Sequence, residues 1–478
     1  MLFNSINFAF FLPIVFFLYW FVAHKNYKYQ NILLLVASYF FYACWDYRFL
    51  FLLVFSTLLD YFTGLRMGDA KSISGKKFWF WLSILVNLGF LGFFKYYNFF
   101  VTSFAEAVAN LGFHIDIWTL NVILPVGISF YTFHGLSYVI DIYYDRIKPE
   151  KNFIDYSVFV SFFPLLVAGP IERATHLLPQ IQTKRNFNYT TAVDGLRQIL
   201  WGLFKKIVIA DNCAQYANMI FNDSGHYSGS TLVLGALFFT FQIYCDFSGY
   251  SDIALGTARL FGIDLLRNFA FPYFSRDIAE FWRRWHISLS TWFRDYLYIP
   301  LGGSKGGTWM KIRNTFIIFL VSGFWHGANW TFLVWGLLNA LYFLPLLLSK
   351  TNRTHIETVA QGRDVPTVRE LFRMGITFSL TVFAWIFFRA KDMTHAISYI
   401  KGIFNSSLIS KPEIVPTTLF LLIGFFIFIE WVGRENQYAL QRFGLRWPKV
   451  IRIGFYYALV ILLFAFMGKE QEFIYFQF

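Results

Sequence analysis

The sequence carries little charge. Of its 478 residues, 14% are Asp, Glu, Lys or Arg, whereas soluble domains carry about 25% charged residues. Hydrophobic residues make up 57% of the chain and aromatic residues 22%, including 63 phenylalanines. This composition excludes a soluble globular protein and predicts an all-α, polytopic membrane protein.

Cysteine is scarce as well. The three cysteines, Cys44, Cys213 and Cys245, are odd in number and lack metal-type spacing, so we expect neither a disulfide nor a metal site. The sequence also has no nucleotide-binding fingerprint and no Ser-His-Asp motif. The glycine-rich stretch 301–307 lacks the Gly-Lys-Ser/Thr ending of a phosphate-binding loop, which favours a flexible connection.

Positive charge exceeds negative charge, with a formal net charge of +13. In a membrane protein, Lys and Arg collect in cytoplasmic loops. We therefore favour this explanation over a specific anionic ligand or nucleic acid. Lysines and arginines follow the first and third apolar segments, which places the N-terminus outside.

Apolar segments recur along the whole chain, and we expect ten to thirteen membrane segments. A full span needs about 20 residues, so the shorter segments indicate tilted, partial or protein-buried helices. The first, within Met1–Val22, has no basic leader or cleavage site and is expected to be retained. The candidates are Ile6–Ala23, Asn31–Trp45, Phe49–Leu65, Phe78–Phe94, Leu120–Ile140, Val158–Ala168, Val193–Ala210, Thr231–Tyr244, Thr315–Leu348, Phe372–Phe388, Thr417–Trp431 and Ile451–Met467.

No soluble domain fits between these segments, and no repeat is visible. We expect a single membrane domain over residues 1–478. The longest weakly apolar stretch, Asp264–Arg313, holds eight basic and four acidic residues. That excess of positive charge favours the cytoplasmic face.

A lone histidine, His326, interrupts the apolar run Thr315–Leu348. That run is too long for one span and too short for two, and Gly323, Gly327 and Asn329 surround the histidine. The pattern predicts two helical pieces that meet near His326. Irregular backbone at membrane depth is tolerated where it is protein-buried or lines a wet cavity. His326 is therefore either a functional group in such a cavity or a core histidine bonded to a neighbouring carbonyl.

A second histidine, His286, lies in the stretch Phe281–Tyr296. Its helical projection predicts one continuous amphipathic helix with an aromatic face that includes Trp285 and a basic face that includes three arginines. Such a helix is typical of a membrane interface, and it could aim His286 inward. The three arginines are Arg283, Arg284 and Arg294.

Two carboxylates, Asp246 and Asp252, lie in the otherwise apolar stretch Gln242–Asp252, together with Ser248 and Tyr250. An intramembrane carboxylate usually pairs or faces water. We expect a structural or supporting role for these residues, either in salt bridges to the arginines above or in orienting a histidine.

Two histidines in aromatic surroundings favour proton transfer. A neutral imidazole can take a proton from a hydroxyl near pH 7, and a hydroxyl that attacks a thioester needs such a base. Acyl transfer to an alcohol is the chemistry that this set supports.

The chain resembles the membrane-bound O-acyltransferase family, and its bacterial alginate O-acetylase branch in particular. The resemblance covers most of the chain and is densest from about residue 240 to 340. It is carried by the segments Tyr244–Ala254, Asn268-Phe269, Pro272-Tyr273, Phe281–Ser290, Trp292–Gly303 and Gly323–Gly327.

The resemblance implies a ring or arch of membrane helices around a central tunnel, with amphipathic and re-entrant helices. It implies a catalytic role for His326, and the family's second histidine corresponds to His286. From the residues themselves we expect substrate-binding or supporting roles for Asp246, Ser248, Tyr250, Asp252, Trp285, Arg283, Arg284, Arg294 and Asn329. It also implies a multi-pass protein of the inner (cytoplasmic) cell membrane with no permanently bound cofactor. The acyl donor would be acetyl-CoA, and a partner acetyltransferase outside the cytoplasm would complete transfer to an exported polysaccharide.

Three alternatives stay open. A sister branch transfers D-alanine to teichoic acid, although the ending Tyr298–Gly303 favours the acetylase branch. The chain could also be a transporter whose histidines line a pathway, but no paired repeats are seen. Finally, it could be a scaffold that only holds an exported acetyltransferase.

Overall fold

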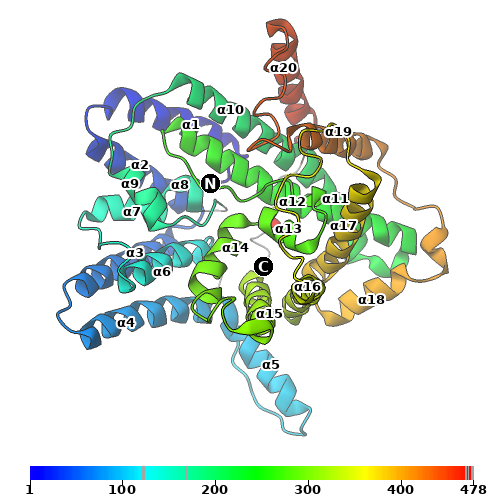
Figure 1. Cartoon of the computed structure of the whole chain (residues 1–478), viewed down its shortest axis with the longest axis horizontal. Coiled ribbons are helices and arrows are strands. Elements are labelled where there is room, and N and C mark those ends of the chain that lie inside the picture. The colour runs from blue at the N-terminus through cyan, green and yellow to red at the C-terminus, as the bar shows by residue number, and fades with distance from the viewer. Residues whose placement is uncertain (121–123, 167–168, 469–470, 472, 475–478) are drawn as a thin grey trace. The chain divides into compact units, whose positions relative to one another are not determined.

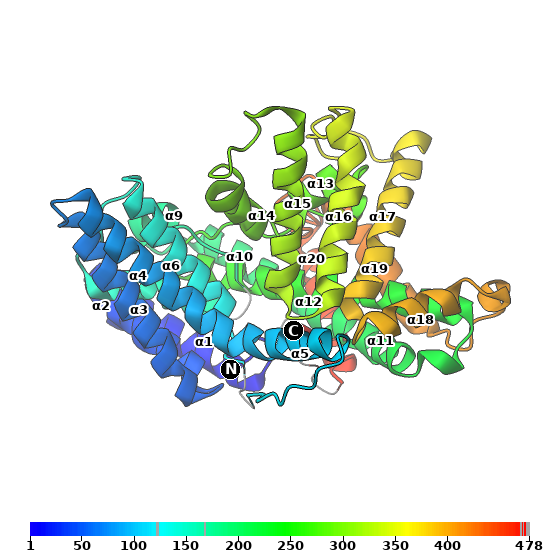
Figure 2. The same ribbon diagram turned by 90° about the horizontal axis from the view of Figure 1, so that it is seen from below.

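The computed structural model describes residues 1–120, 124–166, 169–468, 471 and 473–474 (Figures 1 and 2). Helices account for 71% of the described residues, which contain no strand, as the all-α prediction requires. The chain forms two compact units. The first contains Met1–Ala192 and Ala258–Leu266, and the second contains Val193–Thr257 and Arg267–Phe478. The expectation of one domain over 1–478 stays a prediction.

In the first unit, three helices pack side by side around a buried polar cluster (Figure 1). Asp60 of α3 accepts hydrogen bonds from Ser83 and Asn87 of α4, and α6 packs against both helices. The helices of this unit are α1 (Ile6–Phe17), α2 (Tyr27–Ala43), α3 (Tyr47–Gly68), α4 (Ile73–Leu91), α5 (Tyr97–Ala109), α6 (Ile128–Tyr143), α7 (Phe153–Ser161), α8 (Phe163–Leu166), α9 (Ala174–Ile181) and the start of α10 (Tyr189–Leu203).

Two predicted spans in this unit have different bounds. The expected span Leu120–Ile140 begins eight residues later, since α6 starts at Ile128, after the left-handed Gly127. The expected span Val158–Ala168 is instead the pair of short helices α7 and α8, separated at Phe162. Residues 121–123 and 167–168 of these two predictions lie outside the described residues.

The second unit contains the motif-dense part of the chain. Its helices are the rest of α10, the π-helix η3 (Phe204–Ala210), α11 (Asp211–Asn222), α12 (Gly229–Leu260, up to Thr257), α13 (Ile278–Arg284), α14 (Ile287–Phe293), the π-helix η6 (Arg294–Tyr298), α15 (Gly307–His326), α16 (Trp330–Leu348), α17 (Val368–Arg389), α18 (Met393–Ile403), α19 (Thr417–Gly433) and α20 (Lys449–Ala465).

Helices α15 and α16 form a tight antiparallel hairpin, and α17 packs against α16 (Figure 2). Two glycines allow the close approach. A Cβ on Gly323 would lie 2.3 Å from the carbonyl oxygen of Phe332, and one on Gly336 would lie 2.4 Å from that of Phe319. Small residues at such contacts let helix backbones approach closely within a membrane.

Five helical stretches are long and apolar enough to cross a membrane: Tyr47–Gly68, Ile73–Ala109, Gly229–Leu260, Trp330–Leu348 and Val368–Arg389. Ile6–Val22 and Thr417–Gly433 are shorter apolar helices. The chain is therefore a multi-pass membrane protein. Ten to thirteen segments, the ring and the tunnel stay predictions.

Candidate active site

His326 is the last residue of α15, at the point where the hairpin turns. The chain leaves the helix at Gly327, and α16 begins at Trp330. The predicted break in the run Thr315–Leu348 is thus confirmed. The His326 side chain is buried, with 4% of its surface exposed. Its ring packs edge-on against Trp335 of α16 and Phe388 of α17, each 5.2 Å away between ring centroids.

Asn329 completes the turn. Its side-chain oxygen accepts the backbone N–H of Thr331 at 3.0 Å and so caps α16, and its amide donates to the carbonyl of Lys391 at 2.8 Å. Both bonds use main-chain partners. The structure therefore gives Asn329 a role in shaping the turn that follows His326.

His286 lies between two short helices. The stretch 281–296 was predicted to be one continuous helix, and this is wrong: α13 ends at Arg284 and α14 begins at Ile287. His286 itself is left-handed, with φ 43° and ψ 55°. Few residues other than glycine adopt this region, with asparagine, aspartate and histidine enriched among them, and such residues cluster at functional sites.

The break turns the His286 ring into the interior, with only 1% of the residue exposed. Neither ring nitrogen has a hydrogen-bond partner among the described residues. Because desolvation disfavours the charged form, burial lowers the pKa of His286 to about 3, so the ring is neutral at pH 7.

The tryptophan Trp325 brings the two histidines into one aromatic cluster. Its ring centroid lies 6.0 Å from that of His286 and 4.9 Å from that of His326. The ring of Phe247 on α12 also packs against the His286 ring, with 4.7 Å between their centroids. Two histidines 40 positions apart in the sequence thus contact the same indole ring.

Trp285 is fully buried and belongs to the same aromatic cluster. It packs against Phe269 and Trp385, each at 5.1 Å, and Trp385 in turn stacks on Trp335 at 5.6 Å. Trp335 contacts His326, so a continuous set of aromatic rings joins the two histidines by a second route.

The two acids of α12 pair with lysines rather than with the arginines considered from the sequence. The π-helix η3 presents both of its lysines to α12. Lys206 lies 2.9 Å from Asp246, and Lys205 lies 2.6 Å from Asp252. Asp246 also accepts the backbone N–H of Ile474 at 2.8 Å. These carboxylates therefore fix η3 and the C-terminal segment to α12.

Arg283 and Arg284 already bond to groups close to them, so Asp246 and Asp252 pair with lysines instead. Arg283 donates to the carbonyls of Asn352 and His355, and Arg284 pairs with Glu280 at 2.9 Å. Arg294 has 60% of its side chain accessible, and among the described residues it pairs only with the adjacent Asp295.

Ser248 and Tyr250 are both buried on α12. Tyr250 lies under the ammonium group of Lys206, 5.7 Å from its Nζ. Ser248 lines a small polar cavity with Lys205 and Asp252, next to Arg267.

Sequence reasoning missed three polar residues that support the site. Lys205 and Lys206 lie in the apolar run Val193–Ala210, and Glu430 lies in the apolar helix α19. Glu430 accepts hydrogen bonds from Tyr244 and Trp201. The sequence did contain a signal for these three residues, because ionisable side chains inside apolar runs are energetically costly and usually have a function.

The sequence is also similar to those of known proteins. The sequence model of the membrane-bound O-acyltransferase family, MBOAT, matches residues 144–387, a range that includes both histidines. The chain belongs to the membrane-bound O-acyltransferase family. It is therefore an acyltransferase, as the resemblance implied.

Among the relatives of this MBOAT chain, the probable alginate O-acetylase AlgI of Pseudomonas aeruginosa is 40% identical over 85% of this chain and 75% of that protein. The peptidoglycan O-acetyltransferase of Helicobacter pylori is 34% identical over 100% of this chain and 98% of that protein. The teichoic acid D-alanyltransferase of Bacillus subtilis is more distant, at 28% identity over 58% of this chain and 71% of that protein.

Proposed function

We propose that this chain is an O-acetyltransferase of the inner (cytoplasmic) cell membrane. It would pass an acetyl group from cytoplasmic acetyl-CoA toward an exported polysaccharide. Relatives named as alginate and peptidoglycan O-acetylating enzymes support the acetyl group and the polysaccharide. The observation that carries the proposal is the pair of buried histidines that both contact Trp325.

His326 is the proposed general base. It ends α15, at the turn between the two helices of the hairpin. In the proposed step, the acceptor hydroxyl gives its proton to His326 while its oxygen bonds to the thioester carbonyl carbon. The carbon–sulfur bond then breaks, and the thiolate of coenzyme A takes a proton as it leaves.

His286 is proposed to act as a neutral group. A ring whose pKa is about 3 is a poor base at pH 7 but remains a hydrogen-bond donor. It is suited to position the acyl donor or to stabilise the developing oxyanion, and its unpartnered ring nitrogens are available for this. Arg294 is the arginine left free enough to attract the phosphates of the donor.

An exported or membrane-anchored acetyltransferase is the proposed partner that completes transfer to the polymer. The chain itself would then present the acetyl group on the far side of the membrane. No resident metal or cofactor is required by this scheme.

The proposal is tested with His326→Ala and His326→Gln, with His226→Ala as the control because His226 is exposed. Polymer acetylation is measured in cells, and loss of acetyl-CoA is measured with purified protein in liposomes. We expect both signals to fall by about 100-fold or more for His326, in the range of lost acid–base catalysis, and to persist for His226. Full acetylation by a correctly inserted His326 variant would overturn the proposal.

The same assay separates the alternatives. Turnover of a D-alanyl carrier instead of acetyl-CoA would assign the teichoic acid branch. Solute exchange without donor turnover would indicate a transporter. Normal acetylation by a His286/His326 double variant that still binds its partner would indicate a scaffold.

A further inference from the structure

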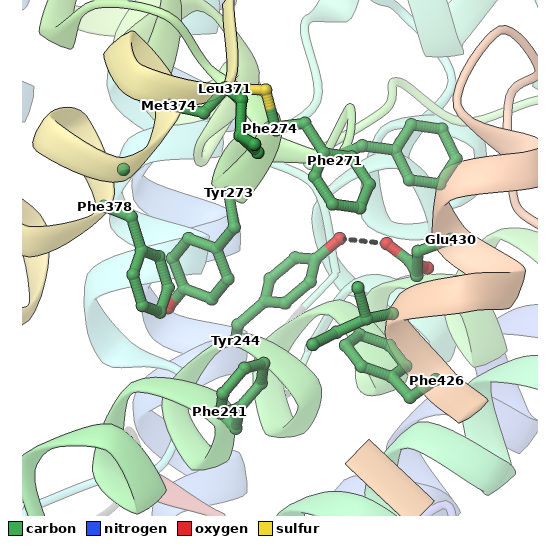
Figure 3. A pocket seen from close by; sticks show the side chains of 12 residues that line it. Phe241, Tyr244, Phe271, Tyr273, Phe274, Leu371, Met374, Phe378, Phe426 and Glu430 are labelled. Carbon is green, nitrogen blue, oxygen red and sulfur yellow. Dashed lines mark hydrogen bonds between the residues drawn. The ribbon is translucent and has the colours of Figure 1, made fainter. Parts of the chain in front are cut away.

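A second pocket lies in the same unit, next to the aromatic cluster but lined by neither histidine. It encloses about 270 Å³ (Figure 3). Its walls come from α12, the segment 271–274, α17 and α19. The lining residues are Phe241, Tyr244, Phe271, Tyr273, Phe274, Leu371, Met374, Gly375, Phe378, Phe426, Ile427 and Glu430.

The pocket is apolar except at one point. Glu430 carries the only carboxyl group among the lining residues, and that group is already satisfied. It accepts the Tyr244 hydroxyl at 2.6 Å, as Figure 3 shows, and the indole N–H of Trp201 at 3.1 Å. Each Glu430 oxygen already accepts one hydrogen bond, and the Tyr273 hydroxyl donates to the carbonyl of Thr240. The rest of the lining is apolar, so the pocket favours an aliphatic guest.

The pocket adjoins an exposed apolar surface of α17. Helix α17 is one of the candidate spans, and its residues Phe372 and Ile376 are 69% and 47% exposed. A shallow apolar groove runs along this surface past Phe372, Ile376 and Leu380. Gly375 lines both the groove and the pocket, and it is exposed. The missing side chain at Gly375 leaves a passage from the surface into the interior.

We propose that this pocket binds one hydrocarbon chain of a bilayer phospholipid, which enters over Gly375. The enclosed 270 Å³ falls just below the span of about 300–1,000 Å³ that is usual for whole small-molecule ligands. The space suits part of one chain, with the headgroup left outside at the surface. The groove along α17 continues the path for the rest of the chain.

The bound hydrocarbon chain would support the active site by packing against aromatic residues next to it. Tyr273 and Tyr244 line the pocket, and each lies 6.0 Å from the ring of Trp285. Trp285 directly precedes His286. A filled pocket would therefore hold Trp285 in place, and with it the left-handed turn at His286. This inference concerns lipid binding and does not depend on the identity of the acyl donor or acceptor.

The test uses full-length protein in liposomes that contain a phosphatidylglycerol with a photoactivatable diazirine near the middle of one acyl chain. Gly375→Phe fills the passage, and an added Cβ there meets no atom within 4 Å. Gly424→Phe is the matched control, because Gly424 is also an exposed helical glycine with no atom within 4 Å of an added Cβ and does not line the pocket.

We expect cross-links on α12 and on the 271–274 segment in the wild type and the Gly424 variant, and at least a five-fold loss of these cross-links in the Gly375 variant. Cross-links confined to exposed residues, or equal labelling of all three proteins, would overturn the proposal. Thermal unfolding gives an independent readout. Adding phosphatidylglycerol to delipidated protein should raise the Tm of the wild type more than that of Gly375→Phe, since a ligand of the folded state stabilises it. Equal Tm increases would also overturn it.

Discussion

The Ser288 hydroxyl donates a 2.6 Å hydrogen bond to the side-chain oxygen of Asn268. The same asparagine accepts the backbone N–H of Ile287 at 2.9 Å through its carbonyl and donates to the Ser251 hydroxyl of α12 at 2.8 Å. Asn268 thus holds both residues that follow His286 and ties them to α12. It is the residue that keeps the left-handed turn of His286 in place.

We therefore predict that Asn268→Ala lowers kcat by about 10- to 100-fold, because small misplacements of a reacting group cost about 100-fold. Ser288→Ala removes only one of the three bonds and should cost less. The measurement is acetyl-CoA turnover in liposomes, with kcat and KM determined separately. An exposed asparagine, Asn110, supplies the control Asn110→Ala. A KM change at constant kcat would argue against a positioning role.

The buried ion pair between Lys206 and Asp246 offers a second prediction. Lys206→Met leaves the carboxylates of Asp246 and Asp211 without the ammonium group that both pair with, and breaking a buried pair costs about 3–5 kcal/mol. The double variant Lys206→Met/Asp246→Leu should recover part of that loss. Unfolding of the purified protein, followed by thermal denaturation in detergent, provides the comparison. A double variant no more stable than the single one would contradict the expected coupling.

The hairpin of α15 and α16 offers a third prediction. Gly323→Ala should destabilise the protein by about 1–3 kcal/mol, the usual range for overpacking, because the added methyl meets the Phe332 carbonyl. It should also displace His326, three residues away, and so reduce turnover. Gly424→Ala is the control, since open space surrounds its Cβ, and in a helix it should gain up to about 1 kcal/mol. Equal effects of the two variants would show that glycine loss alone, and not the close contact, is responsible.

A fourth prediction concerns pH. Glu172 is fully buried and its carboxylate accepts from the half-exposed His176 at 2.8 Å, which raises the pKa of His176 above its usual value near 6.5. A raised folded-state pKa adds stability below the unfolded pKa, and this stability is lost as pH rises through the folded value. The effect should be under about 1 kcal/mol, because solvent screens the exposed ring.

His176→Gln should therefore lower the Tm more at pH 5.5 than at pH 8.5. Thermal unfolding of both proteins across this range gives the measurement. A difference that grows toward alkaline pH would contradict the assigned sign.

Local patterns predicted part of this site well. Two features predicted the broken helix at His326: the glycines around it, and an apolar run too long for one span and too short for two. Both features can be found in a short stretch of sequence, because the helix destabilisation by glycine and the length of a span do not depend on distant residues. The helical projection of 281–296 gave the buried aromatic face but predicted a continuous helix. Periodicity carries no information on a single left-handed residue, and the turn at His286 depends on bonds to Asn268, which lies outside that window.

The partners of Asp246 and Asp252 could not be predicted from the sequence, for a different reason. Lys205 and Lys206 precede them by about 40 residues and reach them only when η3 docks on α12. A π-helix places adjacent lysines on neighbouring partners, and no sequence periodicity marks it. Pairing of this kind follows from tertiary packing.

The left-handed backbone of His286 has a practical consequence for any attempt to test its imidazole. A side chain at φ 43° stores backbone strain of about 1–3 kcal/mol. His286→Ala removes the ring but keeps most of that strain, whereas His286→Gly removes both. Asparagine tolerates this conformation better than most residues. A series of glycine, alanine and asparagine at this one position therefore separates the chemistry of the ring from the mechanics of the turn.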